Sequence, residues 1–86
     1  MPELCRFFGI VVTMYYNDHP PAHIHLRYGA YRARMSLADG TLLDGVLPRQ
    51  ALNRVRLWRD RHEQALLENW QRAANREPLL AIEPLE

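Results

Sequence analysis

Residues 22–37 read Ala-His-Ile-His-Leu-Arg-Tyr-Gly-Ala-Tyr-Arg-Ala-Arg-Met-Ser-Leu, which is two alternating segments on either side of Gly29-Ala30. A glycine in the first central place is what a type II′ two-residue turn requires, so the stretch predicts an antiparallel hairpin. In this register Tyr28 lies opposite Tyr31. The other predicted pairs are Arg27 with Arg32, Leu26 with Ala33, His25 with Arg34, Ile24 with Met35 and His23 with Ser36.

This register sorts the hairpin side chains onto two chemically different faces. Successive side chains of a strand point to opposite sides of the sheet. A shift of one residue would mix the two sets, so their segregation supports the register. The apolar face contains Ala22, Ile24, Leu26, Ala33, Met35 and Leu37, and the polar face contains His23, His25, Arg27, Arg32, Arg34 and Ser36.

The flanking sequence extends the sheet on both sides of the hairpin. Residues 10–16 are β-branched and aromatic, which is the composition of a largely buried strand. The prolines in Asn17–Pro21 then end that strand, because proline cannot donate to a strand ladder. Asp39-Gly40 predicts a second hairpin turn, of type I′, which leads into a strand at Thr41–Val46.

From Pro48 onward the hydrophobic pattern is helical. Pro48 suits the first turn of a helix, and one stripe of the helix runs to Ala73. Leu57 and Leu67 fall on the opposite side, so the pattern leaves open a kinked pair of helices or one helix with a second, partner-facing contact. The stripe comprises Leu52, Val55, Arg59, His62, Leu66, Trp70 and Ala73, bordered by Ala51, Trp58 and Asn69.

The predicted fold class is α+β. It is an antiparallel β-meander of four to five strands followed by a C-terminal helix, either continuous or kinked into two, packed on one sheet face. Residues 1–86 are expected to form a single domain, with the β-meander at 4–47 and the helical part at 48–75. Residues 76–86 form an extended tail that is interrupted by prolines and is too apolar to be without contacts.

Composition narrows the classes of function. No apolar run approaches the roughly 18 residues of a membrane span, and the N-terminus lacks the pattern of a signal peptide, so a cytoplasmic location is expected. The single cysteine, Cys5, allows no internal disulfide. A net charge of +1 is too low to indicate nucleic-acid binding by its total. All 11 basic residues are arginines, however, and the planar guanidinium group of arginine suits bidentate contacts to carboxylate or phosphate.

Three of the four histidines lie close together, at His19, His23 and His25. Histidine titrates near physiological pH and is the commonest metal ligand in proteins. We predict these three as catalytic residues, and Asp18, Arg27, Arg32 and Arg34 as ligand-binding residues. Because imidazoles on a polar strand face bury little apolar surface, replacing His23 and His25 by glutamine is expected to change the stability by less than about 1 kcal/mol.

Three functional interpretations of this surface stay open, beside a purely structural one. Arginines next to imidazoles can grip a phosphate and supply an acid and a base for phosphodiester cleavage. Alternatively, the cluster His19, His23 and His25 could bind a divalent metal such as zinc. His23 and His25 would share one strand face, His19 or Asp18 would fold back across the prolines as the third ligand, and one position would be left open. The protein could also be a non-catalytic partner of another protein. In the structural interpretation, the histidines only hydrogen-bond to one another and to Asp18 or Asp44.

Several stretches together have the pattern of one known family: Arg6-Phe7, residues 17–26 (NDHPPAHIHL), Leu47-Pro48-Arg49, Trp58, His62 and residues 66–70 (LLENW). With these residues the chain resembles a bacterial family known as domain of unknown function 4160. The family usually has Asn-Glu-His where this chain has Asn17-Asp18-His19, a change that keeps the carboxylate. The resemblance implies no established activity. It does imply a protein partner from a neighbouring gene, of the domain of unknown function 2442 family, in a module that is similar to a toxin–antitoxin pair.

The expected function follows from the surface and the resemblance together. We expect a component of a bacterial two-gene, toxin–antitoxin-like module whose His/Arg sheet face engages phosphate, RNA or DNA. Hydrolytic, nuclease-like activity is an open part of this expectation, and so is self-association into a homo-oligomer. The alternatives are a metal-binding accessory protein and a non-catalytic protein-binding partner.

Overall fold

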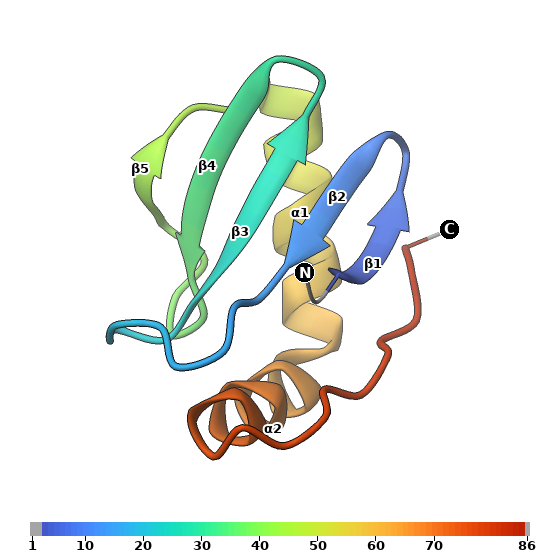
Figure 1. Ribbon diagram of the computed structural model, residues 1–86. Coiled ribbons are helices and arrows are strands. Elements are labelled where there is room, and N and C mark those ends of the chain that lie inside the picture. Colours follow the sequence, from blue (N-terminus) through green and yellow to red (C-terminus); the bar gives the residue numbers. More distant parts are fainter. Residues whose placement is uncertain (1–2, 86) are drawn as a thin grey trace.

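The chain folds into a five-stranded antiparallel sheet followed by two helices (Figure 1). The computed structural model describes residues 3–85. Each strand pairs with its neighbours in the chain, in the order β1-β2-β3-β4-β5, so the sheet is a meander. This confirms the predicted α+β class. The elements are β1 (Glu3–Phe7), β2 (Ile10–Thr13), β3 (His23–Tyr28), β4 (Tyr31–Ser36), β5 (Leu42–Gly45), α1 (Arg49–Arg61) and α2 (Glu63–Ala74).

The central hairpin has the predicted register over its whole length, from Tyr28 opposite Tyr31 to His23 opposite Ser36. Gly29 has the positive φ, 58°, that the tight turn demands and that glycine adopts at little cost. On its other edge β3 pairs with β2, where Thr13 lies opposite His25. The polar and apolar faces of the hairpin therefore continue across the sheet.

The strand predicted at residues 10–16 is too long, because β2 ends at Thr13. After Thr13 the chain leaves the sheet: Met14 is fully buried in the core, and Asn17 adopts a left-handed conformation with a φ of 55°. The backbone N–H of Asn17 donates to the carbonyl of Ala73 in α2, at 3.2 Å. The residues after Thr13 thus pack against the core and α2 instead of continuing the strand.

The predicted type I′ turn at Asp39-Gly40 is wrong. Such a turn needs positive φ at both central residues, and only Gly40 has it, at 74°. The strands are joined by a longer loop, in which Ser36 and Thr41 are linked by a 2.8 Å backbone bond. The Asp39 carboxylate accepts hydrogen bonds from the N–H and hydroxyl of Thr41, which stabilises this loop instead. The last strand is correspondingly shorter than Thr41–Val46.

The helical part is the kinked pair of helices, with the break at His62. Pro48 is the residue that precedes α1 rather than a member of its first turn, since its ψ is 150°. In Figure 1, α1 lies behind the sheet, and α2 lies beyond the end at which β2 ends and β3 begins. The apolar face of the sheet is thus covered by α1.

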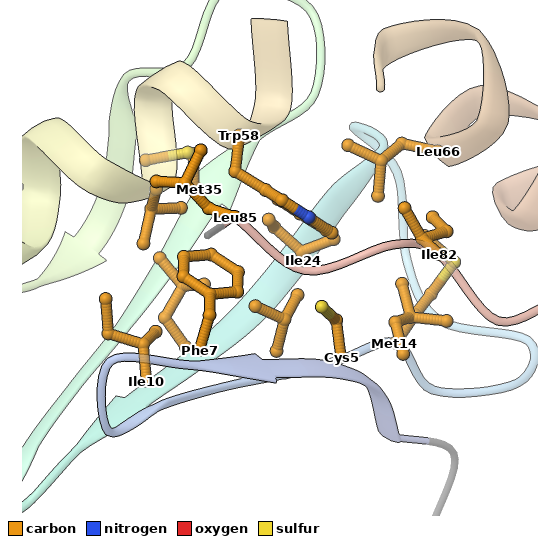
Figure 2. Close-up of a cluster of buried hydrophobic side chains, with 14 of the residues drawn as sticks. Cys5, Phe7, Ile10, Met14, Ile24, Met35, Trp58, Leu66, Ile82 and Leu85 are labelled. Carbon is orange, nitrogen blue, oxygen red and sulfur yellow. The ribbon is translucent and has the colours of Figure 1, made fainter. Parts of the chain in front are cut away.

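The core forms between α1 and the sheet around Trp58, which is fully buried (Figure 2). The Trp58 ring lies 5.5 Å from the ring of Phe7, and its Nε1 donates to the carbonyl of Glu83 at 2.7 Å. Ile82 and Leu85 of the tail are buried beside it, which confirms that the tail makes contacts. The C-terminal segment is therefore part of the core.

One charged residue of the predicted stripe, Arg59, is also buried. Its guanidinium donates to the carbonyls of Leu37 and Ala38, at 2.8–3.0 Å. These carbonyls belong to the loop between β4 and β5, where no strand partner is present to bind them. Arg59 thus satisfies buried backbone acceptors, which explains its place on an apolar stripe.

Candidate functional site

The polar face of the sheet forms an open groove of about 560 Å³. Its arginines on β3 and β4, Arg27 and Arg32, alternate with the buried Leu26 and Ala33, so they point away from the core. The core side of the sheet is the one that α1 covers, behind the sheet in Figure 1. The strands contribute alternate side chains to it, so residues from all five strands meet there. Its charged lining consists of Arg6, Arg27, Arg32, Arg34, Glu3 and Asp44, and His25 and Tyr15 complete its ionisable groups.

Two of the four groove arginines are neutralised by carboxylates. The Arg6 Nε lies 2.6 Å from the Glu3 carboxylate, and the Arg34 Nη2 lies 2.7 Å from the Asp44 Oδ2. The hydrogen bond from Arg34 holds the pKa of Asp44 below its usual value, and that from Arg6 does the same for the pKa of Glu3. Both carboxylates are therefore ionised near neutral pH.

The other two groove arginines, Arg27 and Arg32, lie directly opposite each other on β3 and β4. Both are exposed, and neither forms an ion pair within residues 3–85. Like charges placed directly opposite each other in a sheet are destabilising. This pair leaves an excess of positive charge in the groove, which an anion would neutralise.

Beyond the His25 end of the groove, Asp18 brings two histidines together. The segment between β2 and β3 runs beyond the end of the sheet, where Asn17 is hydrogen-bonded to Ala73 of α2 (Figure 1). The Asp18 Oδ2 then lies 3.0 Å from the His23 Nε2 and 2.9 Å from the His25 Nε2. The His23 Nδ1 lies 2.7 Å from the carbonyl oxygen of Pro21. We call Asp18, His23 and His25 the His/Asp cluster.

Packing holds the His/Asp cluster in place. His23 is only 1% exposed and lies against the Trp70 ring of α2, with ring centroids 5.3 Å apart. The Tyr15 ring meets His25 edge-on, at 4.4 Å. Neither Tyr15 nor Trp70 was predicted as a site residue. Trp70 reaches His23 only because α2 packs at this end of the sheet, and no local sequence pattern reports such a long-range contact.

The Asp18 carboxylate is ionised although it is partly buried. Desolvation alone would raise its pKa. Hydrogen bonds from His25 and from the backbone N–H of His19, together with the charges of the two histidines, outweigh that effect and lower the pKa. Asp18 is therefore an acceptor for hydrogen bonds and a negative centre for a cation.

The structure separates the three histidines that were predicted to be catalytic. His25 lines the groove, whereas His23 is buried behind it. His19 is exposed and contributes its backbone N–H to Asp18, at 2.8 Å, and its imidazole makes no hydrogen bond within residues 3–85. Of the two residues considered as a third metal ligand, Asp18 is the one that lies with His23 and His25. Arg27, Arg32 and Arg34, which were predicted to bind ligand, all line the groove.

The burial of His23 also revises the expected stability of histidine variants. His23 was predicted to lie on the polar strand face and to bury little apolar surface, but Trp70 of α2 covers its ring and leaves it 1% exposed. Replacing it therefore removes buried contacts as well as hydrogen bonds. Of the two acceptors proposed in the structural interpretation, Asp18 binds the histidines, whereas Asp44 pairs with Arg34.

Comparison with known proteins identifies the family. A family model described as a domain of unknown function (DUF4160) matches residues 9–71, and the chain belongs to that family. The matched range includes the whole His/Asp cluster and the arginines of β3 and β4. No curated protein and no solved structure matches the chain. Between residues 3 and 85, neither helix has both the length and the apolar character that crossing a membrane requires.

Proposed function

We propose that the groove on the open sheet face binds the phosphate groups of a nucleotide or a single-stranded nucleic acid. The observation that carries the proposal is the pair of opposed arginines, Arg27 and Arg32. They are exposed in a concave surface, and neither has a carboxylate partner within the described residues. A phosphate between them would remove their mutual repulsion.

The remaining groove residues suit such a ligand. Guanidinium groups bind phosphate in a bidentate manner, with more geometric specificity than a lysine provides. The groove volume, about 560 Å³, lies in the range of sites that hold small ligands. Tyr15 offers an aromatic ring on which a base can stack. His25 lines the groove beside it, and its imidazole can donate a hydrogen bond or transfer a proton.

A stronger form of the proposal includes cleavage of the bound nucleic acid, within a two-gene, toxin–antitoxin-like module. Among residues 3–85, His25 is the one imidazole that lines the groove, so cleavage would depend on it. His23 acts at most through His25, because it is buried. Binding and cleavage are separate claims, and binding is tested first.

The test measures the anisotropy of a fluorescein-labelled single-stranded RNA in the presence of EDTA, over a range of salt concentrations. The groove variant is Arg27→Gln with Arg32→Gln. The matched control is Arg49→Gln with Arg61→Gln, which removes the same charge from exposed positions on α1. We expect the groove variant to bind at least about tenfold more weakly, a loss of about 1.4 kcal/mol, and the control to bind as the wild type does.

The salt dependence gives a second, independent readout. For a single strand, each lost phosphate contact reduces the magnitude of the slope of log K against log salt by about 0.7. The groove variant lacks two arginines, so the magnitude of its slope should be smaller by about 1.4. Equal losses in the groove variant and the control would show that binding follows net charge alone. That result, or the absence of binding at low salt, would refute the proposal.

A further inference from the structure

We infer that Asp18, His23 and His25 form a binding site for one divalent transition-metal ion. The site lies beside the arginine groove but does not depend on it. Two imidazoles and one carboxylate are a ligand set that suits zinc and its neighbours in the first transition row. The inference goes beyond phosphate binding, since the metal would be held by the protein alone.

The positions of the three ligand atoms support the inference. The Asp18 Oδ2, the His23 Nε2 and the His25 Nε2 all lie within 4.8 Å of one another. With metal–ligand distances of 2.0–2.2 Å, two ligands of a tetrahedral ion are about 3.3 Å apart. The two nitrogen–oxygen separations, 3.0 and 2.9 Å, are slightly shorter than that. A small displacement of the Asp18 side chain would therefore make room for an ion.

The hydrogen bond at the other nitrogen of His23 is the second argument. A carbonyl oxygen can only accept, so the His23 Nδ1 must carry the proton that it donates to Pro21. In a neutral imidazole this leaves a lone pair on Nε2, which faces the acceptor oxygen of Asp18 at 3.0 Å. Two acceptors attract each other only when a proton or a cation lies between them. A backbone carbonyl that accepts from the second nitrogen is also one of the usual outer partners of a metal-binding histidine.

The surroundings are compatible with a cation. His23 and Trp70 form a rigid, buried wall on one side. His25 lines the groove on the other side, so a bound ion would lie at the edge of the groove. The charge of Arg34, the residue opposite His25, is countered by its ion pair with Asp44. The competing interpretation is a second proton on His23, which would make the His/Asp cluster a purely structural hydrogen-bond network.

The experiment uses the untagged protein, freed of metal with EDTA and transferred into chelator-free buffer without phosphate or nucleic acid. Co²⁺ is titrated while the visible d–d absorption reports the coordination, and Zn²⁺ binding is measured by calorimetry. We expect one ion per chain. We also expect Asp18→Asn and His25→Gln each to weaken binding at least about tenfold. Asp18→Asn keeps the shape of the side chain, and His25 is partly exposed, so both variants should fold.

The matched control is His19→Gln, which removes a neighbouring histidine that lies outside the His/Asp cluster. It should bind both metals as the wild type does. The inference is overturned if the wild type binds no stoichiometric ion, or if His19→Gln loses as much affinity as His25→Gln. Circular dichroism in EDTA checks that each variant is folded. Because the RNA assay is performed in EDTA and the metal assay without RNA, either proposal can fail alone.

Discussion

Replacing His23 by alanine should destabilise the protein by about 3–5 kcal/mol, whereas replacing His19 should change its stability by less than about 0.5 kcal/mol. Both are histidines of the same sequence cluster, but their environments differ. His23 is 1% exposed, and both of its ring nitrogens are hydrogen-bonded. His19 is exposed, and its contribution to the cluster comes from its backbone N–H, which alanine retains.

The magnitude for His23 follows from three losses. The bond to the Pro21 carbonyl is worth about 1 kcal/mol. In EDTA no metal ion can link Nε2 to the charged Asp18, so this contact counts as a hydrogen bond with a proton between the two atoms, worth about 1.5–3 kcal/mol. The cavity left beside Trp70 adds roughly 1 kcal/mol. An 86-residue protein has a total stability of roughly 4–13 kcal/mol, so this single change would remove a large part of it.

The assay is urea denaturation at pH 7 in EDTA, followed by tryptophan fluorescence, with the slope of the transition compared between variants. His25→Ala provides a graded comparison, because the side chain is 28% exposed and makes one hydrogen bond to Asp18. The free energy of unfolding of His25→Ala should lie between those of His23→Ala and His19→Ala. If the free energy of unfolding of His23→Ala is within about 1 kcal/mol of the wild-type value, the His23 ring is not buried as described.

Further predictions concern two glycines, the single cysteine and the neighbouring gene. Gly45→Ala should destabilise by more than about 2 kcal/mol in the same urea assay, because a Cβ at its φ of 81° would collide with the Arg32 carbonyl. Gly29→Ala, with a φ of 58° but open space around it, should cost only about 1–2 kcal/mol. Burial raises the pKa of the Cys5 thiol. The unfolded thiol therefore loses its proton first as the pH rises past about 8.5, and stability measured at pH 9.5 should fall more in the wild type than in Cys5→Ala. Finally, co-expression with the product of the neighbouring gene should relieve any growth defect caused by this gene alone, and equal growth under all conditions would contradict the two-gene module.

The sheet was predictable where a local pattern and a turn residue agree. In residues 22–37 the alternation of side chains and the glycine at position 29 both require the observed register. At Asp39-Gly40 the dipeptide alone suggested a type I′ turn, but the carboxylate of Asp39 bonds to Thr41 and stabilises a different loop. A dipeptide pattern does not include that side-chain competition.

The His/Asp cluster was predictable in its residues but not in its arrangement. The sequence indicated that His23 and His25 share a face, because they are two residues apart on a strand. It left open whether His19 or Asp18 would fold back to them, and it did not indicate that one oxygen of Asp18 would contact both rings. That depends on how the segment between β2 and β3 folds back against α2, through contacts such as Asn17 with Ala73. Such long-range contacts leave no periodic signal.

Core-facing and groove-facing side chains alternate along β3 and β4, and this arrangement affects how the sequence of the protein can evolve. Arg27 and Arg32 project from the side of the sheet that takes no part in the core, so substitutions there leave the packing around Trp58 untouched. A library randomised at these two positions should therefore consist largely of folded proteins with different ligand preferences. His23 both belongs to the His/Asp cluster and is buried against Trp70. Selection for a new ligand at this position would therefore also act on the stability of the fold. Substitutions at Arg27 and Arg32 can therefore change the bound ligand without affecting folding, whereas substitutions at His23 affect both.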